Sequence, residues 1–170
     1  MHSLSKPKVS VCIPVFNGGE YIEETIHSIL LQTFEDYQLI VCDNCSEDDT
    51  EEIVRSFDDS RIVYVRNDKN LGLVGNANRC LDLAGSEFIN IFHHDDLMLP
   101  ENLQKKVRVL DEHPNVGFVH SNLILFDQKG RDVANNIWSR DSRKDYIESG
   151  KVVFNRYLDY LPNGASLFIG

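Results

Sequence analysis

The sequence predicts an α/β fold, a three-layer α/β/α sandwich around a mostly parallel central sheet. Short apolar runs and longer amphipathic segments alternate four times between residues 9 and 110. Such alternation builds βαβ units with right-handed crossovers, which produce a parallel sheet covered by helices on both faces. The 170 residues are enough for one domain with a single core.

Four short runs rich in β-branched and aromatic residues are the predicted strands. They are Val9–Val15, Tyr37–Cys42, Arg61–Arg66 and the run that begins at Phe88. The first is almost continuously apolar, as expected for a strand covered on both faces, and Pro14 marks its end because proline cannot donate to a central ladder. The third is shorter and more polar, which predicts a position near a sheet edge.

A predicted helix follows each of these strands. Ser46, three residues before Asp49, resembles the start signal of the second helix, and Pro100 with Glu101 opens the fourth. The residues expected to face the core are Ile22, Ile26, Ile29 and Leu30, then Ile53, Val54 and Phe57, then Ala77, Leu81 and Ala84, and finally Leu103, Val107 and Leu110.

The pattern changes beyond residue 115. Residues 116–119 and 123–126 are apolar runs, residues 127–130 form a predicted turn, and residues 131–148 are polar and aperiodic, which predicts a surface loop that could cover a ligand. A helix over 151–160 and a strand over 165–169 are expected after it.

The composition restricts the class of partner. Seventeen basic and 27 acidic residues give a net charge of −10, which disfavours nucleic acid and suits a divalent cation. No apolar run has the roughly 20 residues that a membrane span requires, and the first residues lack the apolar core of a signal peptide, so a cytoplasmic location is expected. The four cysteines have no spacing typical of a disulfide framework.

The most informative polar cluster is His93–Asp96, which directly follows the fourth strand. Two adjacent carboxylates repel each other unless a cation or hydrogen-bond donors compensate, so this position suggests a bound metal or a hydroxyl-rich ligand. The plainer interpretation is a solvated acidic loop that caps the next helix.

Two further polar clusters follow strands, at Phe16–Asn17 and at Asp43–Asn44. Ligands of open parallel sheets bind at the carboxyl ends of strands, where these clusters are expected to meet. An aromatic ring can stack on a base, Asp43 or Asn44 can accept from a base N–H, and Asp95 with Asp96 can hold a cation that bridges a diphosphate. Together they predict a nucleotide-diphosphate site, and the sequence contains neither G-x-G-x-x-G nor a P-loop motif.

Four segments resemble the family 2 glycosyltransferases of GT-A fold. They are VSVCIPVFN (9–17), IVCDNCSEDDT (40–50), NLG (70–72) and FINIFHHDD (88–96), and the resemblance covers about residues 8–125. It implies an inverting transfer of a sugar from a UDP-, dTDP- or GDP-sugar to a hydroxyl of a glycan, lipid-linked or other acceptor, typical of bacterial polysaccharide or cell-envelope synthesis. It also implies a divalent cation, Mg²⁺ or Mn²⁺, and a cytoplasmic location that could be at the inner face of the membrane.

The resemblance also assigns site residues by position. Pro14 and Phe16 would line the base pocket, Asp43 and Asn44 would contact the base, Asn70 and Asn78 would lie along the donor, Asp95 would be the main metal ligand, and Asp96 would be its neighbour. Two positions depart from the family pattern. Asn44 stands where a second Asp is common, which leaves the base preference open, and His93 replaces the first acid of Asp-x-Asp-Asp, so metal binding would rest mainly on Asp95.

The resemblance further predicts how the chain divides. We expect a single GT-A domain with a flexible N-terminus (1–7), a donor-binding half (8–115) and the start of an acceptor half (116–170). The carboxylate that deprotonates the acceptor is expected beyond Gly170, so the chain would bind the donor with little or no transfer activity.

Three other functions are open at this point. A metal-dependent phosphoesterase could use His93–Asp96, although only His120 offers a further ligand and consecutive side chains of an extended strand seldom reach one ion. A nucleotidyltransferase would need a basic glycine-rich loop, which Asn17–Glu20 is not. A non-catalytic nucleotide-sugar binding module is the third.

Overall fold

The computed structural model describes residues 6–121, 124–126, 132–135, 147 and 149. They fall into two compact units, residues 6–108 and the described residues from 109 onward. The elements of the first are β1 (Val9–Val15), α1 (Ile22–Leu30), β2 (Tyr37–Asp43), α2 (Thr50–Ser56), β3 (Ile62–Arg66), α3 (Gly72–Leu83), β4 (Phe88–Ile91) and α4 (Asn102–Glu112), whose last turn enters the second unit.

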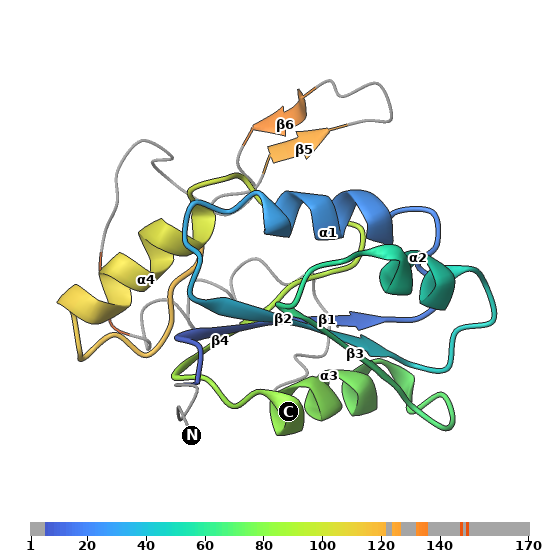
Figure 1. Ribbon diagram of the computed structural model, residues 1–170. Coiled ribbons are helices and arrows are strands. Elements are labelled where there is room, and N and C mark those ends of the chain that lie inside the picture. The colour runs from blue at the N-terminus through green and yellow to red at the C-terminus, as the bar shows by residue number, and fades with distance from the viewer. Residues whose placement is uncertain (1–5, 122–123, 127–131, 136–146, 148, 150–170) are drawn as a thin grey trace, which may run out of the picture. The chain divides into compact units, whose positions relative to one another are not determined.

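The four strands form one parallel sheet in the order β3-β2-β1-β4 (Figure 1). Successive strands are added outward from β1 to β3, and the chain then returns to place β4 on the other side of β1. The strand order therefore reverses between β1 and β4. The predicted parallel sheet is confirmed, with β3 at an edge.

Pro14 lies inside β1 rather than after it, paired with Cys42. The carbonyl group of Cys12 accepts a hydrogen bond from the Phe92 N–H, so even-numbered residues of β1 direct their backbone groups toward β4. The pairing with β4 already ends at Cys12. The backbone nitrogen of Pro14, which carries no hydrogen, therefore points to a side where no strand is paired. The ladder loses no hydrogen bond.

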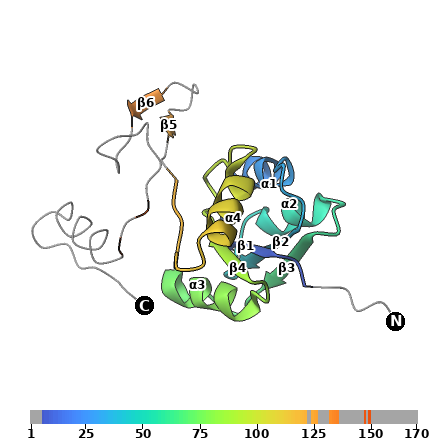
Figure 2. The same cartoon turned by 90° about the vertical axis from the view of Figure 1, so that its left-hand side faces the viewer.

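Helices cover both faces of the sheet, which confirms the three-layer sandwich. Figures 1 and 2 show α1 and α2 on one face and α3 on the other. The larger core cluster joins odd-numbered residues of β1 and β2 to Ile22, Ile26 and Ile29 of α1, to Val54 of α2 and to Leu103 and Val107 of α4. The smaller cluster, on the α3 face, consists of Cys12, Ile40, Cys42 and Cys80. These cysteines are free and serve as small apolar side chains.

The predicted inward face of α3 is wrong at Leu81, whereas the predicted Ala84 packs against the smaller cluster. Leu81 is 47% exposed, whereas Asn76 and Cys80 are buried. The side-chain amide of Asn76 donates to the carbonyl groups of Cys42 (2.9 Å) and Val15 (3.4 Å), where the strands end. The backbone carbonyl groups at the ends of these strands accept hydrogen bonds from Asn76, and this determines which face of α3 is buried. Apolar periodicity does not reveal such a requirement.

The predicted helix start at Ser46 is also wrong. The N-cap residue of α2 is Asp49, and the N–H of Thr50 is bound by the Asp48 carboxylate at 3.1 Å. The hydroxyl group of Ser46 donates instead to Asp43 at 2.6 Å. Ser46 thus belongs to the end of β2 and not to the helix.

The second unit contains β5 (Ile124–Phe126) and β6 (Asp132–Asn135), which pair antiparallel. The predicted loop over 131–148 is therefore wrong for residues 132–135, because pairing with β5 supplies their backbone partners. Residues 116–119 form no strand. The predicted turn over 127–130, the helix over 151–160 and the strand over 165–169 lie outside the described residues. Of the described helices, none has the length and apolarity needed to cross a membrane.

Candidate functional site

The three polar clusters lie at the same edge of the sheet. The strands β1, β2 and β4 are parallel neighbours, so Phe16, Asp43 and the His93–Asp96 segment all follow carboxyl ends. The reversal of strand order lies between β1 and β4. In open α/β sheets this is the position where a crevice forms and ligands bind.

The loop after β1 is held by the loop after β2. The N–H of Asn17 donates to the Ser46 hydroxyl (2.9 Å), and the Asn17 side-chain oxygen accepts from the Glu47 N–H (2.8 Å). Asn17 adopts a φ of 51°, a left-handed conformation that asparagine tolerates better than most residues. The N–H of Gly18 donates to Thr50 at 2.9 Å. These bonds fix the backbone beside Phe16.

The same loop touches the loop after β4. Gly18 is buried, and a Cβ at this position would lie 2.5 Å from Val15 Cγ2 and 2.8 Å from His94 Cδ2. Only glycine permits this approach. The hydroxyl group of Thr25 in α1 lies 2.7 Å from the His94 carbonyl oxygen and 3.0 Å from that of Asp96, and it donates to them. Thr25 thus fixes the backbone that carries both carboxylates.

The side chains of Asp95 and Asp96 are exposed. Among the described residues, no arginine or lysine forms an ion pair with either of them. Desolvation and the neighbouring charge of Asp95 raise the pKa of Asp96, against the opposing effect of His93 and His94. The pair is therefore electrostatically suited to a cation.

Asp43 is the opposite case, because it is fully buried and fully hydrogen-bonded. Its Oδ1 accepts from the backbone N–H (2.9 Å) and hydroxyl (2.6 Å) of Ser46, and its Oδ2 accepts from the Tyr64 hydroxyl (2.5 Å) and the Arg66 guanidinium (2.8 Å). Burial raises the pKa of Asp43, but the hydrogen bonds from Ser46, Tyr64 and Arg66 outweigh it and hold the pKa below its usual value. No acceptor position of this carboxylate is left for a ligand.

Asn44 is buried within a chain of amide groups. Its Oδ1 accepts from the Leu71 N–H (2.8 Å) and from Asn67 (3.2 Å), and its Nδ2 donates to Asn70 at 2.8 Å. Asn67 also donates to Asn76 at 2.8 Å. These amides connect the ends of β1 and β2 to the loop before α3, and so fix the position of Asn70.

The other assigned residues differ in accessibility. Phe16 is 42% exposed, Pro14 is partly buried, and Asn70 is exposed at the start of α3. Asn78 is exposed as well, and it lies about 200° around the helix from the buried Asn76. Phe16 and Asn70 are therefore open to a ligand, whereas Asn78 points away from the strand ends.

The residues present fit a divalent cation that keeps part of its hydration shell. In the described part of the chain, no group of three or more His, Cys, Asp and Glu side chains is arranged to hold a metal. Two carboxylates suffice for Mg²⁺ or Mn²⁺ when water and substrate phosphate supply the remaining oxygens. A structural zinc site, which needs four protein ligands, does not fit.

The sequence profile of the glycosyl transferase family 2 matches residues 10–159, which is most of the chain. This chain belongs to glycosyl transferase family 2. Its fold agrees with that assignment: the crystal structure of S. aureus TarS 1–349 in complex with UDP-GlcNAc superposes with a TM-score of 0.63 at 28% identity, over 78% of this chain and 38% of TarS. The GT-A fold is thereby confirmed.

Two further proteins are similar. The mannosyltransferase PcManGT from Pyrobaculum calidifontis, in complex with GDP-Man and Mn²⁺, gives a TM-score of 0.56 at 26% identity, over 63% of this chain and 33% of that one. The Escherichia coli UDP-Glc:alpha-D-GlcNAc-diphosphoundecaprenol beta-1,3-glucosyltransferase WfgD is 32% identical over 150 residues, 88% of this chain and 54% of WfgD. The chain spans about half the length of the curated relatives it matches.

Sequence reasoning missed the residues that hold the site together. Thr25, Asn76 and Arg66 lie in regular elements, and each is joined to the strand ends by hydrogen bonds. A polar residue on the buried face of a predicted helix was the available signal for Thr25, which lies one position before Ile26. No comparable pattern marks Arg66.

Proposed function

We propose that this family 2 chain binds a nucleotide-diphosphate sugar and is the donor-binding part of a glycosyltransferase that inverts the anomeric centre. The acceptor would be a hydroxyl of a glycan, for which a lipid-linked carrier is the form supported by the name of WfgD. Bacterial polysaccharide or cell-envelope synthesis is the corresponding process. The catalytic base predicted beyond Gly170 stays a prediction, as does the division of one domain at residue 115.

The observation that carries this proposal is the contact between the loops after β1 and β4. Gly18 lies against His94, and Thr25 holds the backbone of Asp96, so the exposed ring of Phe16 and the exposed carboxylates belong to one rigid edge of the sheet. A nucleoside needs an apolar face and its diphosphate needs a cation site. Both are offered here at the strand-order reversal.

We assign the cation to Asp95, with Asp96 as its neighbour. PcManGT, which was solved with Mn²⁺, supports a divalent metal in this fold. When bound, the cation would stabilise the negative charge that develops on the departing diphosphate. The chain itself contributes the orientation of the two carboxylates, through Thr25, and the repulsion between them that a cation relieves.

The base would meet the exposed surfaces of Pro14, Phe16 and Asn70. Asp43 and Asn44 would support these residues without contacting the base, because both are buried and their hydrogen-bonding atoms are occupied. A direct contact of Asp43 with a base N–H would require Tyr64 or Arg66 to leave its carboxylate. We therefore assign Asp43 a positioning role.

The test is a titration of the chain with UDP, dTDP and GDP, each with Mn²⁺ and with EDTA. We expect one nucleotide to bind more tightly than the others and its affinity to rise with Mn²⁺. The variant Asp95→Ala should lose the increase with Mn²⁺ and should keep the affinity measured in EDTA. An unchanged response to Mn²⁺ in this variant would refute the cation assignment.

The same samples separate the remaining functions. A metal-dependent phosphoesterase would release phosphate from the nucleotide or from a simple phosphate ester, which a donor-binding chain would leave intact. A nucleotidyltransferase would bind a nucleoside triphosphate with Mg²⁺ in preference to the diphosphate. Binding of a diphosphate without hydrolysis supports the proposal.

A further inference from the structure

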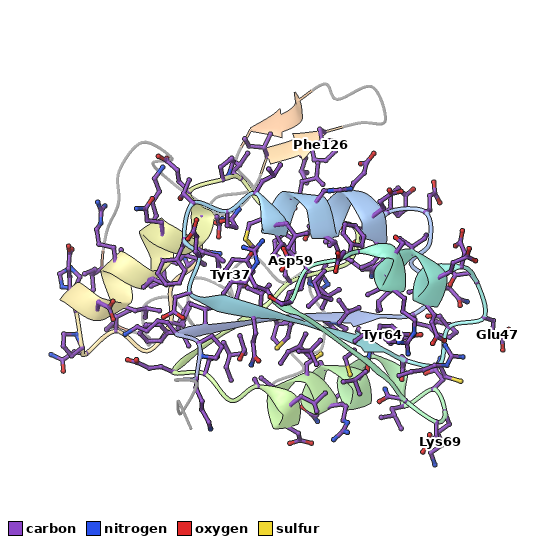
Figure 3. All side chains as sticks on the ribbon, in the orientation of Figure 1. Tyr37, Glu47, Asp59, Tyr64, Lys69 and Phe126 are labelled. Atoms are coloured by element: carbon purple, nitrogen blue, oxygen red, sulfur yellow. The ribbon has the colours of Figure 1, made fainter. Side chains whose placement is uncertain are left out.

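A pocket of about 520 Å³ lies at the carboxyl end of β3, the edge strand on the side of the sheet away from β4. We call it the basic pocket. It is lined by Arg66, Asn67, Asp68, Lys69, Leu71 and Arg79. Figure 3 shows Lys69 at the tip of the loop between β3 and α3. Three of these six residues are cations, in a chain whose net charge is −10.

Two of the three cations of this pocket have no ion-pair partner among the residues that the structure describes. Arg66 is paired with Asp43, but Lys69 and Arg79 form no ion pair with any described residue. Asp68 is the single acid in the lining. Two unpaired cations that face the same cavity repel each other, and an anion between them removes this cost.

The floor of the pocket is rigid. The Arg66 guanidinium is held at 2.8 Å by both Asp43 and the Ser46 carbonyl oxygen. Asn67 is 8% exposed, and its amide group donates to Asn44 and Asn76. A ligand therefore has to order only the exposed side chains of Lys69 and Arg79. Guanidinium and ammonium donors of this kind are the groups that recognise phosphate oxygens.

The pocket cannot serve the diphosphate that is bound near Asp95. β3 is separated from the gap between β1 and β4 by β2 and β1, which at the usual strand spacing is about 12 Å. At this separation we expect a diphosphate that shares a cation with Asp95 to lie outside the basic pocket. The anion of the basic pocket would then come from another group.

We propose that the basic pocket is a second anion site, which binds a phosphate group carried by a ligand other than the donor. Free phosphate or diphosphate and the headgroup of an anionic phospholipid share this chemistry. The proposal goes beyond donor binding, because Lys69 and Arg79 are assigned no contact with the base, the diphosphate or the cation. Arg66 and Asn67 are hydrogen-bonded to Asp43 and Asn44, so the test below measures the donor site separately.

The test uses inorganic pyrophosphate in EDTA, so that the cation site cannot contribute. The wild-type chain should bind pyrophosphate, and the double variant K69Q/R79Q should bind it roughly tenfold more weakly, because two phosphate contacts are lost. The matched control R55Q/K105Q removes the same charge from two exposed ion pairs outside the pocket and should bind as wild type. Equal weakening in both variants would show only a general charge effect and would overturn the proposal.

A second arm identifies the source of the phosphate. Co-sedimentation is measured with vesicles of phosphatidylglycerol and with vesicles of phosphatidylcholine alone. Binding to the first that K69Q/R79Q loses and the control keeps supports the site with a lipid headgroup as its ligand, whereas pyrophosphate binding without vesicle binding supports it with a soluble ligand. If K69Q/R79Q matches the wild type with both probes, the proposal is wrong.

Failure of this proposal can be distinguished from failure of the donor site. The variant K69Q/R79Q should keep its Mn²⁺-dependent affinity for the preferred nucleotide, and Asp95→Ala should keep its binding of pyrophosphate in EDTA. If K69Q/R79Q instead loses nucleotide binding along with pyrophosphate binding, the pocket is part of the donor site and the inference of a second site is overturned.

Discussion

The loops after β2 and after β4 both place aspartates at the carboxyl edge of the sheet, but they use them differently. Asp43 is fully buried and accepts four hydrogen bonds from Ser46, Tyr64 and Arg66. Asp95 and Asp96 are exposed, and neither forms an ion pair with a lysine or arginine of the described residues. From this difference we infer that Asp43 stabilises the fold and propose that Asp95 and Asp96 bind a ligand. Each variant below changes one side of this comparison.

The largest expected effect on stability comes from Asp43→Ala. The substitution leaves the guanidinium of Arg66 and the hydroxyl of Tyr64 without their acceptor, and loss of one partner of such a pair typically costs about 3 kcal/mol, less where solvent reaches the remaining charge. Urea unfolding measures this free energy. Asp58→Ala, at an exposed position, is the control and should be within about 0.5 kcal/mol of wild type.

A smaller loss is expected from Asn76→Ala. The carbonyl groups of Val15 and Cys42 and the amide of Asn67 would each lose a hydrogen bond. The Val15 carbonyl keeps the Asn44 N–H and the Asn67 amide keeps Asn44 as partners, so we expect a total loss of about 2 kcal/mol. Asn78→Ala on the exposed side of the same helix is the matched control. If the two variants unfold at the same urea concentration, the amide chain does not stabilise the strand ends.

Gly18→Ala tests whether the loops after β1 and β4 are coupled. The added Cβ meets Val15 and His94, so we expect about 1 to 2 kcal/mol of destabilisation together with a weaker Mn²⁺-dependent affinity for the nucleotide. Gly19→Ala is the comparison, because the nearest atom that its Cβ would meet belongs to the exposed side chain of Asp49, which makes no capping hydrogen bond and can turn away. Normal nucleotide binding by Gly18→Ala would mean that the loops after β1 and β4 are not coupled.

The smallest effect is the pH dependence that Asp43 contributes. The folded state holds the pKa of Asp43 below its unfolded value of 3.8, so this stabilisation is fully present above that value and is lost as the pH falls through the lower, folded pKa. The free energy of unfolding of the wild type should thus decline more steeply below about pH 4 than that of Asp43→Asn. Parallel acid profiles for the two chains would contradict this.

Much of the fold could be predicted from the sequence, because apolar periodicity reports burial directly. Val9–Val15 and Tyr37–Cys42 are predicted as apolar strands, the first of them covered on both faces, and both are central in the sheet. The strand β6 could not be predicted, because the residues of 132–135 have no apolar pattern of their own and their partners belong to β5.

The site is predictable in position but not in the role of each residue. The order of strands brings Phe16, Asp43 and Asp95 to one edge, as the sequence implies. What the sequence does not indicate is which polar atoms are already used by the protein. Asp43 and Asp95 are both aspartates at or after the end of a strand. Ser46 occupies one carboxylate oxygen of Asp43, and Tyr64 and Arg66, which are more than twenty residues away, occupy the other. The sequence likewise does not show that Asn76, and not the assigned Asn78, makes the hydrogen bonds to the strand ends.

The most direct test compares Asp43→Asn and Asp95→Asn, and measures the free energy of unfolding and the Mn²⁺-dependent affinity for UDP, or for whichever nucleotide binds best, on the same preparations. We predict that Asp95→Asn unfolds within about 0.5 kcal/mol of wild type and loses the increase in affinity with Mn²⁺. We predict that Asp43→Asn is strongly destabilised and, where it is folded, keeps that increase. A fully stable Asp43→Asn, or an Asp95→Asn that responds to Mn²⁺ as the wild type does, would contradict the division between the two loops.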